Sequence, residues 1–285
     1  MSGYRHHPEQ DGSAVFGVDA FTAQPFGGNP AAVVLLTEAA HPGWMQRVAA
    51  ELNQPATAFT HRDSSSDWQL RWFTPTTELP LCGHATLAVA HVLHETGLIP
   101  AGETIIFATP TGLLPVHADA GLLWVELPAV ALTAASAPAE ALTALGLQSH
   151  DVVWFGATDY EYVFLLPDPD RVVSVRPDIA ALLRLPVTRT IVTAAGAPAG
   201  APADITSRVF VPAIGLDEDA ATGSAHAVLG PLWATRLNRS RLRALQASPR
   251  GGQLKLELRD GHVRVGGRAV TVSRGHLMLS QAPPG

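Results

Sequence analysis

Two helical segments that are apolar on nearly every side constrain the fold of this chain more than any other feature. Residues 84–95 and 224–237 are almost wholly apolar, and a helix of this kind has to be buried on all of its sides. Each segment follows a strand-like Phe-x-Pro, an acidic loop and a short motif that begins the helix. Phe73-Thr-Pro75 leads to Cys82-Gly-His-Ala85, and Phe210-Val-Pro212 leads to Thr222-Gly-Ser-Ala225, about 140 residues later. This repeat predicts two pseudo-equivalent domains, each with one buried helix.

Short runs in which apolar and polar residues alternate recur along both halves, and Gly, Pro or Asp bounds most of them, as is typical of β-strands. A further, amphipathic helix is predicted over 43–53. Many strands with one buried helix in each half indicate a sheet wrapped around a helix, repeated. The predicted boundary lies in the Ala/Pro-rich stretch 127–139, and the predicted strands are 14–21, 31–36, 68–73, 104–108, 124–127, 152–155, 162–166, 190–193, 254–258 and 270–272.

Composition and charge exclude several classes of protein. Hydrophobic residues make up 47% of the 285 residues and charged residues 15%, which excludes intrinsic disorder. Because the net charge is -6 and no long basic run occurs, we expect neither nucleic acid nor a membrane as a partner. No apolar stretch reaches the roughly 18 residues that a membrane span needs. Residues 1–13 are polar, lack the apolar core of a secretory signal and are expected to form a loose tail, so we expect a cytoplasmic protein.

The residues that hold cofactors are absent or unsuitably placed. Cys82 is the only cysteine, which excludes internal disulfides and multi-thiolate metal sites. Lys255, the only lysine, lies on the polar face of a predicted strand, which argues against a Schiff base to pyridoxal phosphate. Neither a dinucleotide-binding GxGxxG nor a P-loop motif occurs, and the twelve histidines show no metal-binding spacing. We therefore expect no cofactor and no metal.

The two repeated motifs suggest where a ligand would bind. If the halves are related by a pseudo-twofold axis, the backbone N–H groups of Gly83, His84, Gly223 and Ser224 point into one pocket. Such groups bind a carboxylate and stabilise an enolate-like oxyanion without a basic side chain. The alternative is that these residues merely cap the two helices, which is the commoner role for either loop alone. The duplication favours a ligand cleft.

The motifs resemble those of PhzF-like proteins, the relatives of the phenazine-biosynthesis isomerase, over roughly residues 14–280. The resemblance implies the fold of diaminopimelate epimerase: an α+β fold of two pseudo-symmetric domains, each a barrel-like, mainly antiparallel sheet around a central helix, with the active site between them. It also implies a cofactor-free homodimer. We assign 14–128 with 270–285 to the N-terminal domain and 129–269 to the C-terminal domain. The resemblance rests on Val18-Asp-Ala-Phe21, Gly28-Asn-Pro-Ala-Ala-Val33, Leu70-Arg-Trp-Phe-Thr-Pro75, Leu79-Pro-Leu-Cys-Gly-His-Ala-Thr-Leu87, Glu218-Asp-Ala-Ala-Thr-Gly-Ser-Ala-His226 and Ser248-Pro-Arg-Gly-Gly252.

Two positions depart from the pattern that the resemblance implies. The epimerase relatives place one cysteine before each central helix, whereas here Thr222 stands opposite Cys82. A threonine hydroxyl cannot act as a thiolate-like base near neutral pH, so two-thiol racemisation is excluded. Family members also carry a general acid/base glutamate in an Asn-x-x-Glu-Thr-x-Phe pattern, but this chain has Ala56 there, between Asn53 and Phe59. Either the chemistry moved to other groups, or the reaction changed, or catalysis was lost.

The resemblance also assigns site residues. His84 and Asp219 match family positions beside the substrate and are our predicted catalytic residues. Because a helix N-terminus disfavours the imidazolium, His84 is expected to be neutral and able to accept a proton. Cys82 is expected to be a packing thiol rather than a base, and Arg250 is expected either to meet a substrate carboxylate or only to fix its loop. The predicted substrate-binding residues are Asn29, Cys82, Gly83, Thr222, Gly223, Ser224 and Arg250.

These observations predict a cofactor-independent isomerase that moves a proton, and so shifts a double bond, on a small unsaturated carboxylic or amino acid. The strong preference for Arg over Lys suggests a GC-rich bacterial genome and a role in secondary metabolism, such as antibiotic biosynthesis. Two alternatives remain open. One is a catalytically inactive binding or regulatory protein, and the other is a lyase or hydratase that uses Cys82 opposite Thr222.

Overall fold

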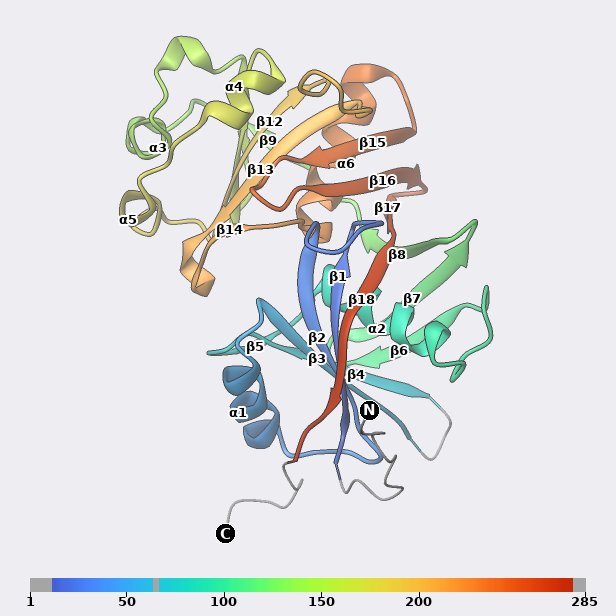
Figure 1. Ribbon diagram of the computed structural model, residues 1–285. Helices are drawn as coiled ribbons and strands as arrows, with labels where there is room; N and C mark the ends of the chain where they lie inside the picture. Colours follow the sequence, from blue (N-terminus) through green and yellow to red (C-terminus); the bar gives the residue numbers. More distant parts are fainter. Residues whose placement is uncertain (1–11, 64–66, 279–285) are drawn as a thin grey trace, which may run out of the picture.

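The computed structural model describes residues 12–63 and 67–278, which form two halves stacked one above the other (Figure 1). Strands dominate both halves, and each half contains one central helix. Most of the predicted tail, 1–11, and the stretch 279–285 lie outside the described residues. Within the described ranges, no helix is both long and apolar enough to span a membrane.

The first half is a curved sheet around α2 (Gly83–Glu95). Ten of the thirteen residues of α2 are buried, but Glu95 in its last turn is exposed, so the expectation of burial on all sides is wrong there. The neighbouring strands β2–β3 and β4–β6 are parallel, and the other pairs are antiparallel. Helix α1 (Pro42–Leu52) packs on the face of β3 and β4 opposite α2. The strands are β1 Ala14–Ala20, β2 Asn29–Leu35, β3 Ala56–Arg62, β4 Trp68–Phe73, β5 Glu78–Leu79, β6 Ile105–Thr109, β7 Gly112–Asp119 and β8 Leu122–Pro128.

The second half repeats this arrangement around α6 (Gly223–Leu237). Its parallel pairs are β11–β12 and β13–β15, the counterparts of β2–β3 and β4–β6. The expectation of full burial is wrong for the last turn of α6, where Arg236 is exposed. Helices α3 (Ala139–Leu145), α4 (Pro169–Ser174) and α5 (Ile179–Leu182) form a separate apolar cluster with β11, β12 and β13. The strands are β10 Trp154–Ala157, β11 Glu161–Leu165, β12 Arg189–Ala195, β13 Ile205–Val211, β14 Leu216–Asp219, β15 Arg241–Gln246, β16 Gly252–Arg259 and β17 His262–Gly267, and the 3-10 turns are Ser149–Asp151 and Pro212–Ile214.

The repeat extends to individual side chains. Arg71 of β4 donates two hydrogen bonds of 2.7 Å to Glu78 of β5. Arg208 of β13 donates two bonds, of 2.8 and 2.7 Å, to Glu218 of β14. In both halves the guanidinium also lies over the ring of the phenylalanine two positions later, at 5.5 and 5.0 Å from its centroid. The same ion pair at the same register indicates that the two halves are copies of one unit.

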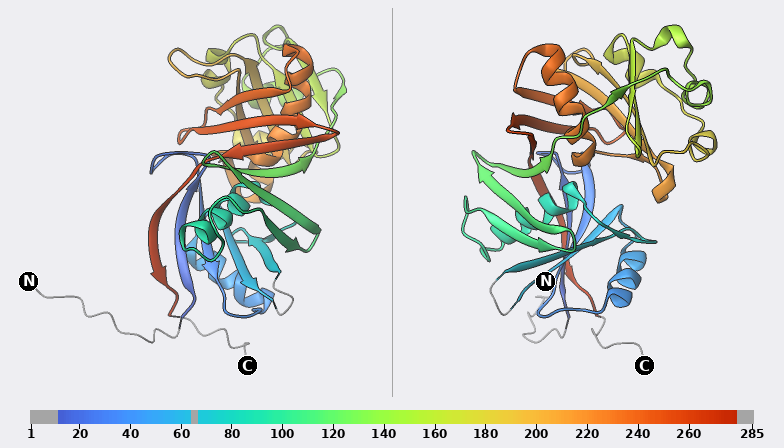
Figure 2. Two further views of the ribbon diagram at one scale, coloured as in Figure 1. Left: turned by 90° about the vertical axis from the view of Figure 1, so that its right-hand side faces the viewer. Right: turned by 180° about the vertical axis from the view of Figure 1, so that it is seen from behind.

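Each half receives one strand from the end of the other. After β8 the chain crosses to form β9 (Thr133–Ala134) beside β10, and after β17 it crosses back to form β18 (Ala269–His276) beside β1. β8 and β17 pair with each other where the halves meet. Figures 1 and 2 show the second crossing as a continuous path from β17 in the upper half to β18 in the lower half. We keep the division of the chain at 128/129 and 269/270 as a proposal, since β8 ends and β18 begins within one residue of it.

Candidate functional site

The N-termini of the two central helices face each other at the junction of the halves. A Cβ atom built on Gly83 would lie 3.5 Å from the Cα atom of Gly223, and one on Gly223 would lie 3.6 Å from the Cα atom of Gly83. The residues before them, Cys82 and Thr222, have extended backbones, and neither side chain caps its helix. Two uncapped N-termini therefore direct their partial positive charges at one small region. An anion bound in this region would be stabilised by both helices.

A buried hydrogen-bond network holds Asp219 at this junction. Asn29 of the first half donates from Nδ2 to Asp219 Oδ1 at 2.6 Å and to the carbonyl of Ala221 at 2.9 Å. The Thr222 hydroxyl donates to Asp219 Oδ2 at 2.6 Å, and Gln246 Nε2 donates to the Asp219 carbonyl at 2.6 Å. One carboxylate oxygen of Asp219 accepts from Asn29 of the first half, and the other accepts from Thr222 of the second half. Asp219 therefore links the two halves. Gln246 was not predicted from the sequence.

The same network leaves one acceptor free. Asn29 is fully buried, and its Oδ1 atom has no hydrogen-bond partner among the described residues. Both bonds of Nδ2 go to oxygen atoms, which fixes the orientation of the amide. An unsatisfied buried acceptor costs free energy unless a donor occupies the site. Asn29 is therefore suited to accept a hydrogen bond from a ligand.

His84 and Cys82 lie together at the start of α2, with Cys82 Sγ 3.4 Å from His84 Nδ1. Burial lowers the pKa of His84, and the negative charge of Asp219 partly opposes this shift. Burial raises the pKa of Cys82 to about 12, and the Asp219 charge adds to the effect. The imidazole is thus neutral near pH 7 and able to accept a proton, whereas the thiol stays protonated. This supports the prediction that Cys82 is a packing thiol rather than a base.

Ala56 occupies a core position. It is fully buried at the start of β3, beside Ala31 of β2, and both belong to the apolar cluster around α2. The position at which the resemblance implies a glutamate therefore holds only a methyl group in apolar surroundings.

A buried ion pair stands at the N-terminus of α6. Arg189, the first residue of β12, donates to Glu161 Oε2 at 2.7 Å and from Nη1 to the Ser224 hydroxyl at 2.8 Å. The side chains of Arg189 and Glu161 are 17% and 4% exposed. Neither residue is predicted from the sequence, because only the register of the duplicated strands brings them to the helix end.

Arg250 fixes a loop next to the junction. Its guanidinium donates to Asp19 Oδ1 at 2.7 Å and to the carbonyls of Gly28 and Gly27 at 2.9 and 3.1 Å. This is the second of the two roles expected for it, and its contact with a substrate stays a prediction. The other predicted site residues, Asn29, Cys82, Gly83, His84, Asp219, Thr222, Gly223 and Ser224, lie together around the two helix ends.

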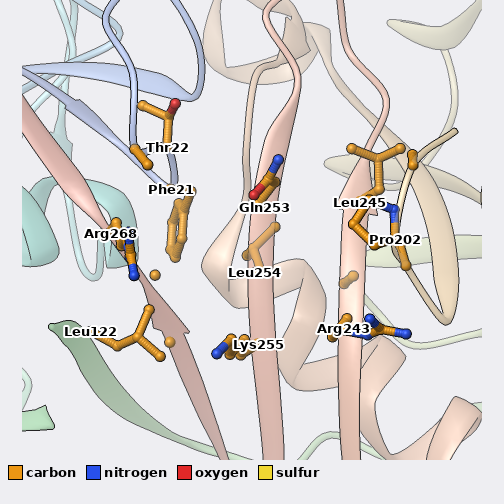
Figure 3. A pocket seen from close by; sticks show the side chains of 16 residues that line it. Phe21, Thr22, Leu122, Pro202, Arg243, Leu245, Gln253, Leu254, Lys255 and Arg268 are labelled. Atoms are coloured by element: carbon orange, nitrogen blue, oxygen red, sulfur yellow. The ribbon is translucent and has the colours of Figure 1, made fainter. Parts of the chain in front are cut away.

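A cavity of about 320 Å³ lies between the two halves, and the Phe21 side chain forms part of its wall (Figure 3). Gln253, Lys255 and Arg268 line it, but none of the predicted site residues does. The Phe21 ring contacts the position of Gly223, at 3.6 Å from a Cβ atom built there, and so separates this cavity from the helix ends. In the part of the chain that the structure describes, no three His, Cys, Asp or Glu side chains are gathered as a metal ion would require.

Comparisons with known proteins identify similar sequences and structures. The sequence profile of the phenazine biosynthesis-like proteins matches residues 18–275. An uncharacterized isomerase of Pseudomonas aeruginosa is 44% identical over 263 residues, which cover 92% of this chain and 97% of that protein. The crystal structure of a PhzF-family phenazine biosynthesis protein from Enterococcus faecalis has a TM-score of 0.87 at 36% identity, over 94% of this chain and 100% of the other.

More distant structures share the fold alone. A hydroxyproline epimerase from Agrobacterium vitis has a TM-score of 0.61 at 14% identity, over 94% of this chain and 93% of its own. Together with the duplicated strand pairing, this similarity confirms the predicted α+β fold of two pseudo-symmetric, epimerase-like halves.

Proposed function

Because the chain belongs to the phenazine biosynthesis-like protein family, as its motifs predicted, we propose that it is an isomerase that moves a proton on a small unsaturated carboxylic or amino acid without a cofactor. One observation supports this most: neutral His84 from the first half and Asp219 from the second lie within electrostatic range of each other at two facing, uncapped helix N-termini. A homodimeric state and a role in bacterial secondary metabolism rest on the resemblance and on the Arg-rich composition.

The site residues can perform each step of a double-bond shift. Neutral His84 accepts a proton from a carbon atom of the substrate, and the electron pair moves into the conjugated carboxylate. The amides at the two helix N-termini stabilise the enolate-like oxyanion that forms. The Asp219 charge stabilises the resulting imidazolium, since it favours the protonated form of His84. The imidazolium then returns the proton to the far end of the conjugated system, so the double bond moves and no atom is gained or lost.

Exchange of substrate protons with deuterated water tests this proposal. We expect the protein to incorporate deuterium from the solvent into a conjugated or β,γ-unsaturated acid in a panel that includes cyclic dienoic acids and unsaturated amino acids. NMR of the panel measures the exchange at each carbon. Incorporation that persists unchanged in the double variant His84→Ala/Asp219→Asn would contradict the assignment of these two groups.

The second candidate is a binding protein that has lost catalysis, and the apolar setting of Ala56 favours it. It predicts ligand binding without deuterium exchange. The lyase or hydratase alternative has less support, because the pKa of Cys82 is raised to about 12 and the Thr222 hydroxyl is engaged with Asp219.

A further inference from the structure

The strand register identifies the counterpart of Ala56 in the second half. In the first half Thr57 of β3 pairs with Phe73 of β4, and in the second half Thr190 of β12 pairs with Phe210 of β13. The residue before each threonine begins its strand, so Arg189 is the pseudo-twofold counterpart of Ala56.

The neighbouring positions follow the same relation. Ala31 pairs with Ala56 in β2–β3, and Glu161 pairs with Arg189 in β11–β12. The first-half pair is a contact between two methyl groups, whereas its second-half counterpart is an ion pair. The two ends of the site therefore differ in charge and polarity, although their backbones match.

The contacts of Arg189 leave part of its guanidinium available beside α6. Nε and Nη2 lie 2.7 and 2.6 Å from Glu161 Oε2, which fixes the plane of the group. Nη1 donates one hydrogen to Ser224 Oγ at 2.8 Å and carries a second hydrogen. Ser224 is the second residue of α6, whose first turn has no side-chain cap. A guanidinium edge, a hydroxyl and free helix amides thus occur within one turn of helix.

A neighbouring histidine, His226, leaves one buried hydrogen-bonding atom without a partner at this end of the site. His226 is fully buried, and its Nδ1 lies 2.8 Å from the carbonyl of Thr222. Burial lowers the pKa of His226 to about 4, the bond to Thr222 opposes the shift, and the charge of Arg189 adds to it. Neutral His226 donates from Nδ1, and its Nε2 atom has no hydrogen-bond partner among the described residues. The free Nε2 atom is an acceptor, so it suits a donor group of a ligand and not its carboxylate.

We propose that Arg189, Ser224 and the first amides of α6 bind the carboxylate of the substrate, while Glu161 positions Arg189. This inference rests on the proposed function, in that the bound acid is the substrate of the isomerase. Because the first half has Ala56 where the second has Arg189, the acid binds in one orientation only. Its carboxylate lies against α6, and its reacting carbon lies toward His84 at the start of α2.

Crotonate and crotonamide, which differ only in the charged group, test the proposal. Arg189→Gln/Glu161→Gln removes the guanidinium without leaving a buried carboxylate unpaired. Arg71→Gln/Glu78→Gln is the matched control, since it removes the equivalent kind of Arg–Glu pair away from the helix ends. Binding is followed by the shifts of protein amide resonances in ligand titrations up to about 50 mM.

We expect the dissociation constant for crotonate to rise at least about tenfold in Arg189→Gln/Glu161→Gln and to stay within twofold of the wild type in the control. The affinity for crotonamide should be the same in all three proteins. Equal crotonate affinity in all three, no crotonate binding to the wild type, or a parallel loss of both ligands would each overturn the proposal. If the double variant does not fold, Arg189→Lys replaces it, because lysine keeps the ion pair with Glu161 but lacks the planar guanidinium that holds a carboxylate with two hydrogen bonds. Unchanged crotonate affinity in Arg189→Lys would also overturn the proposal.

The same proteins separate this inference from the proposed function. Crotonate binding that depends on Arg189, without deuterium exchange into any acid of the panel, would retain the carboxylate site and reject the isomerase. Exchange whose KM is unaffected by Arg189→Gln/Glu161→Gln would retain the isomerase and reject the carboxylate site.

Discussion

The Cα atom of Gly223 lies at ordinary van der Waals distance, 3.5 Å, from the place where a Cβ atom on Gly83 would stand. Neither glycine has a positive φ, so the backbone does not require glycine at either position. Both residues stand at the first position of a helix. We attribute the two glycines to the close approach of the helix ends and to the access that a ligand needs to the amides there.

Alanine or valine at these positions tests that explanation. We expect Gly83→Ala and Gly223→Ala to leave the free energy of unfolding within about 1 kcal/mol of the wild type. Crotonate binding should weaken at least about tenfold in the alanine variants and be lost in Gly223→Val, because the added carbons occupy the space beside the amides. Thermal unfolding and amide-shift titrations measure the two quantities. Wild-type affinity in all variants would leave only a capping role for the two loops.

Loss of His84, the proposed proton carrier, or of the Asp219 charge that stabilises its imidazolium should reduce turnover strongly. A positioned acid or base contributes about 10²–10⁴-fold, so His84→Ala and Asp219→Asn should each lose at least about a hundredfold in kcat. The melting temperature of His84→Ala should stay near that of the wild type, whereas Asp219→Asn should melt lower, because it keeps only one of the two oxygens that accept from Asn29 and Thr222. His91→Ala on the same helix and Asp217→Asn on the same strand are matched controls and should keep most of the activity.

His84 and Asp219 should also act as a unit. Because the Asp219 charge favours the protonated form of His84, the double variant should be little worse than the worse single variant. Kinetics of the four proteins on one substrate measure the coupling. Fully additive losses would mean that the two residues act independently.

The sequence predicts helices that are buried on nearly all sides and strands that have one buried and one exposed face. The two central helices are apolar on nearly every side, and the half-buried strands β1 and β4 alternate. Strand β3 was missed, because α2 covers one of its faces and α1 the other, and its first five residues are all buried. Every residue of β13 is buried as well, including Arg208, so its sequence does not alternate.

The site was predictable only where its residues lie in the repeated motif or in the motifs that carry the family resemblance. His84 and Ser224 belong to the repeated motif, whereas the resemblance identifies Asn29, Asp219 and Arg250. Arg189 and Glu161 are 28 residues apart and become visible only when the register of β11 and β12 is compared with that of β2 and β3. Charge pairing between neighbouring strands depends on their register in the folded chain, which periodicity does not encode.

The thiol of Cys82 should contribute little to catalysis. Since its pKa is raised to about 12, it stays protonated from pH 6 to 9. We expect Cys82→Ser to keep kcat within about tenfold of the wild type. Alkylation by iodoacetamide should be slow, and its rate should rise about tenfold per pH unit without a plateau in this range, because the thiolate fraction follows the pH below the pKa. An inactive Cys82→Ser together with an active His84→Ala would show that the thiol is the base.

Replacing Ala56 by the glutamate of the family pattern should not increase turnover. Ala56→Glu places a carboxylate in the apolar cluster around α2, which should lower the free energy of unfolding by about 1–3 kcal/mol. If the chemistry has moved to His84 and Asp219, turnover of the protein's own substrate should not increase. A large gain in kcat would instead identify the protein as a decayed form of the usual family enzyme.

Stability should fall in mild acid because of His226. Its pKa is about 4 in the folded protein against 6.5 for a free histidine, so the unfolded chain binds more protons between these values. The stabilisation is therefore complete above pH 6.5 and is lost as the pH falls toward 4. It amounts to roughly 3 kcal/mol at about 1.4 kcal/mol per tenfold change in proton affinity. His84, whose pKa is also lowered, adds to the loss with the same sign.

Urea unfolding at pH 7.5 and 4.5 measures the effect. The control is His226→Gln, whose side chain does not titrate. This variant should be less stable than the wild type at pH 7.5, but its free energy of unfolding should fall much less on acidification. An equal loss in both proteins would show that other groups cause the acid sensitivity.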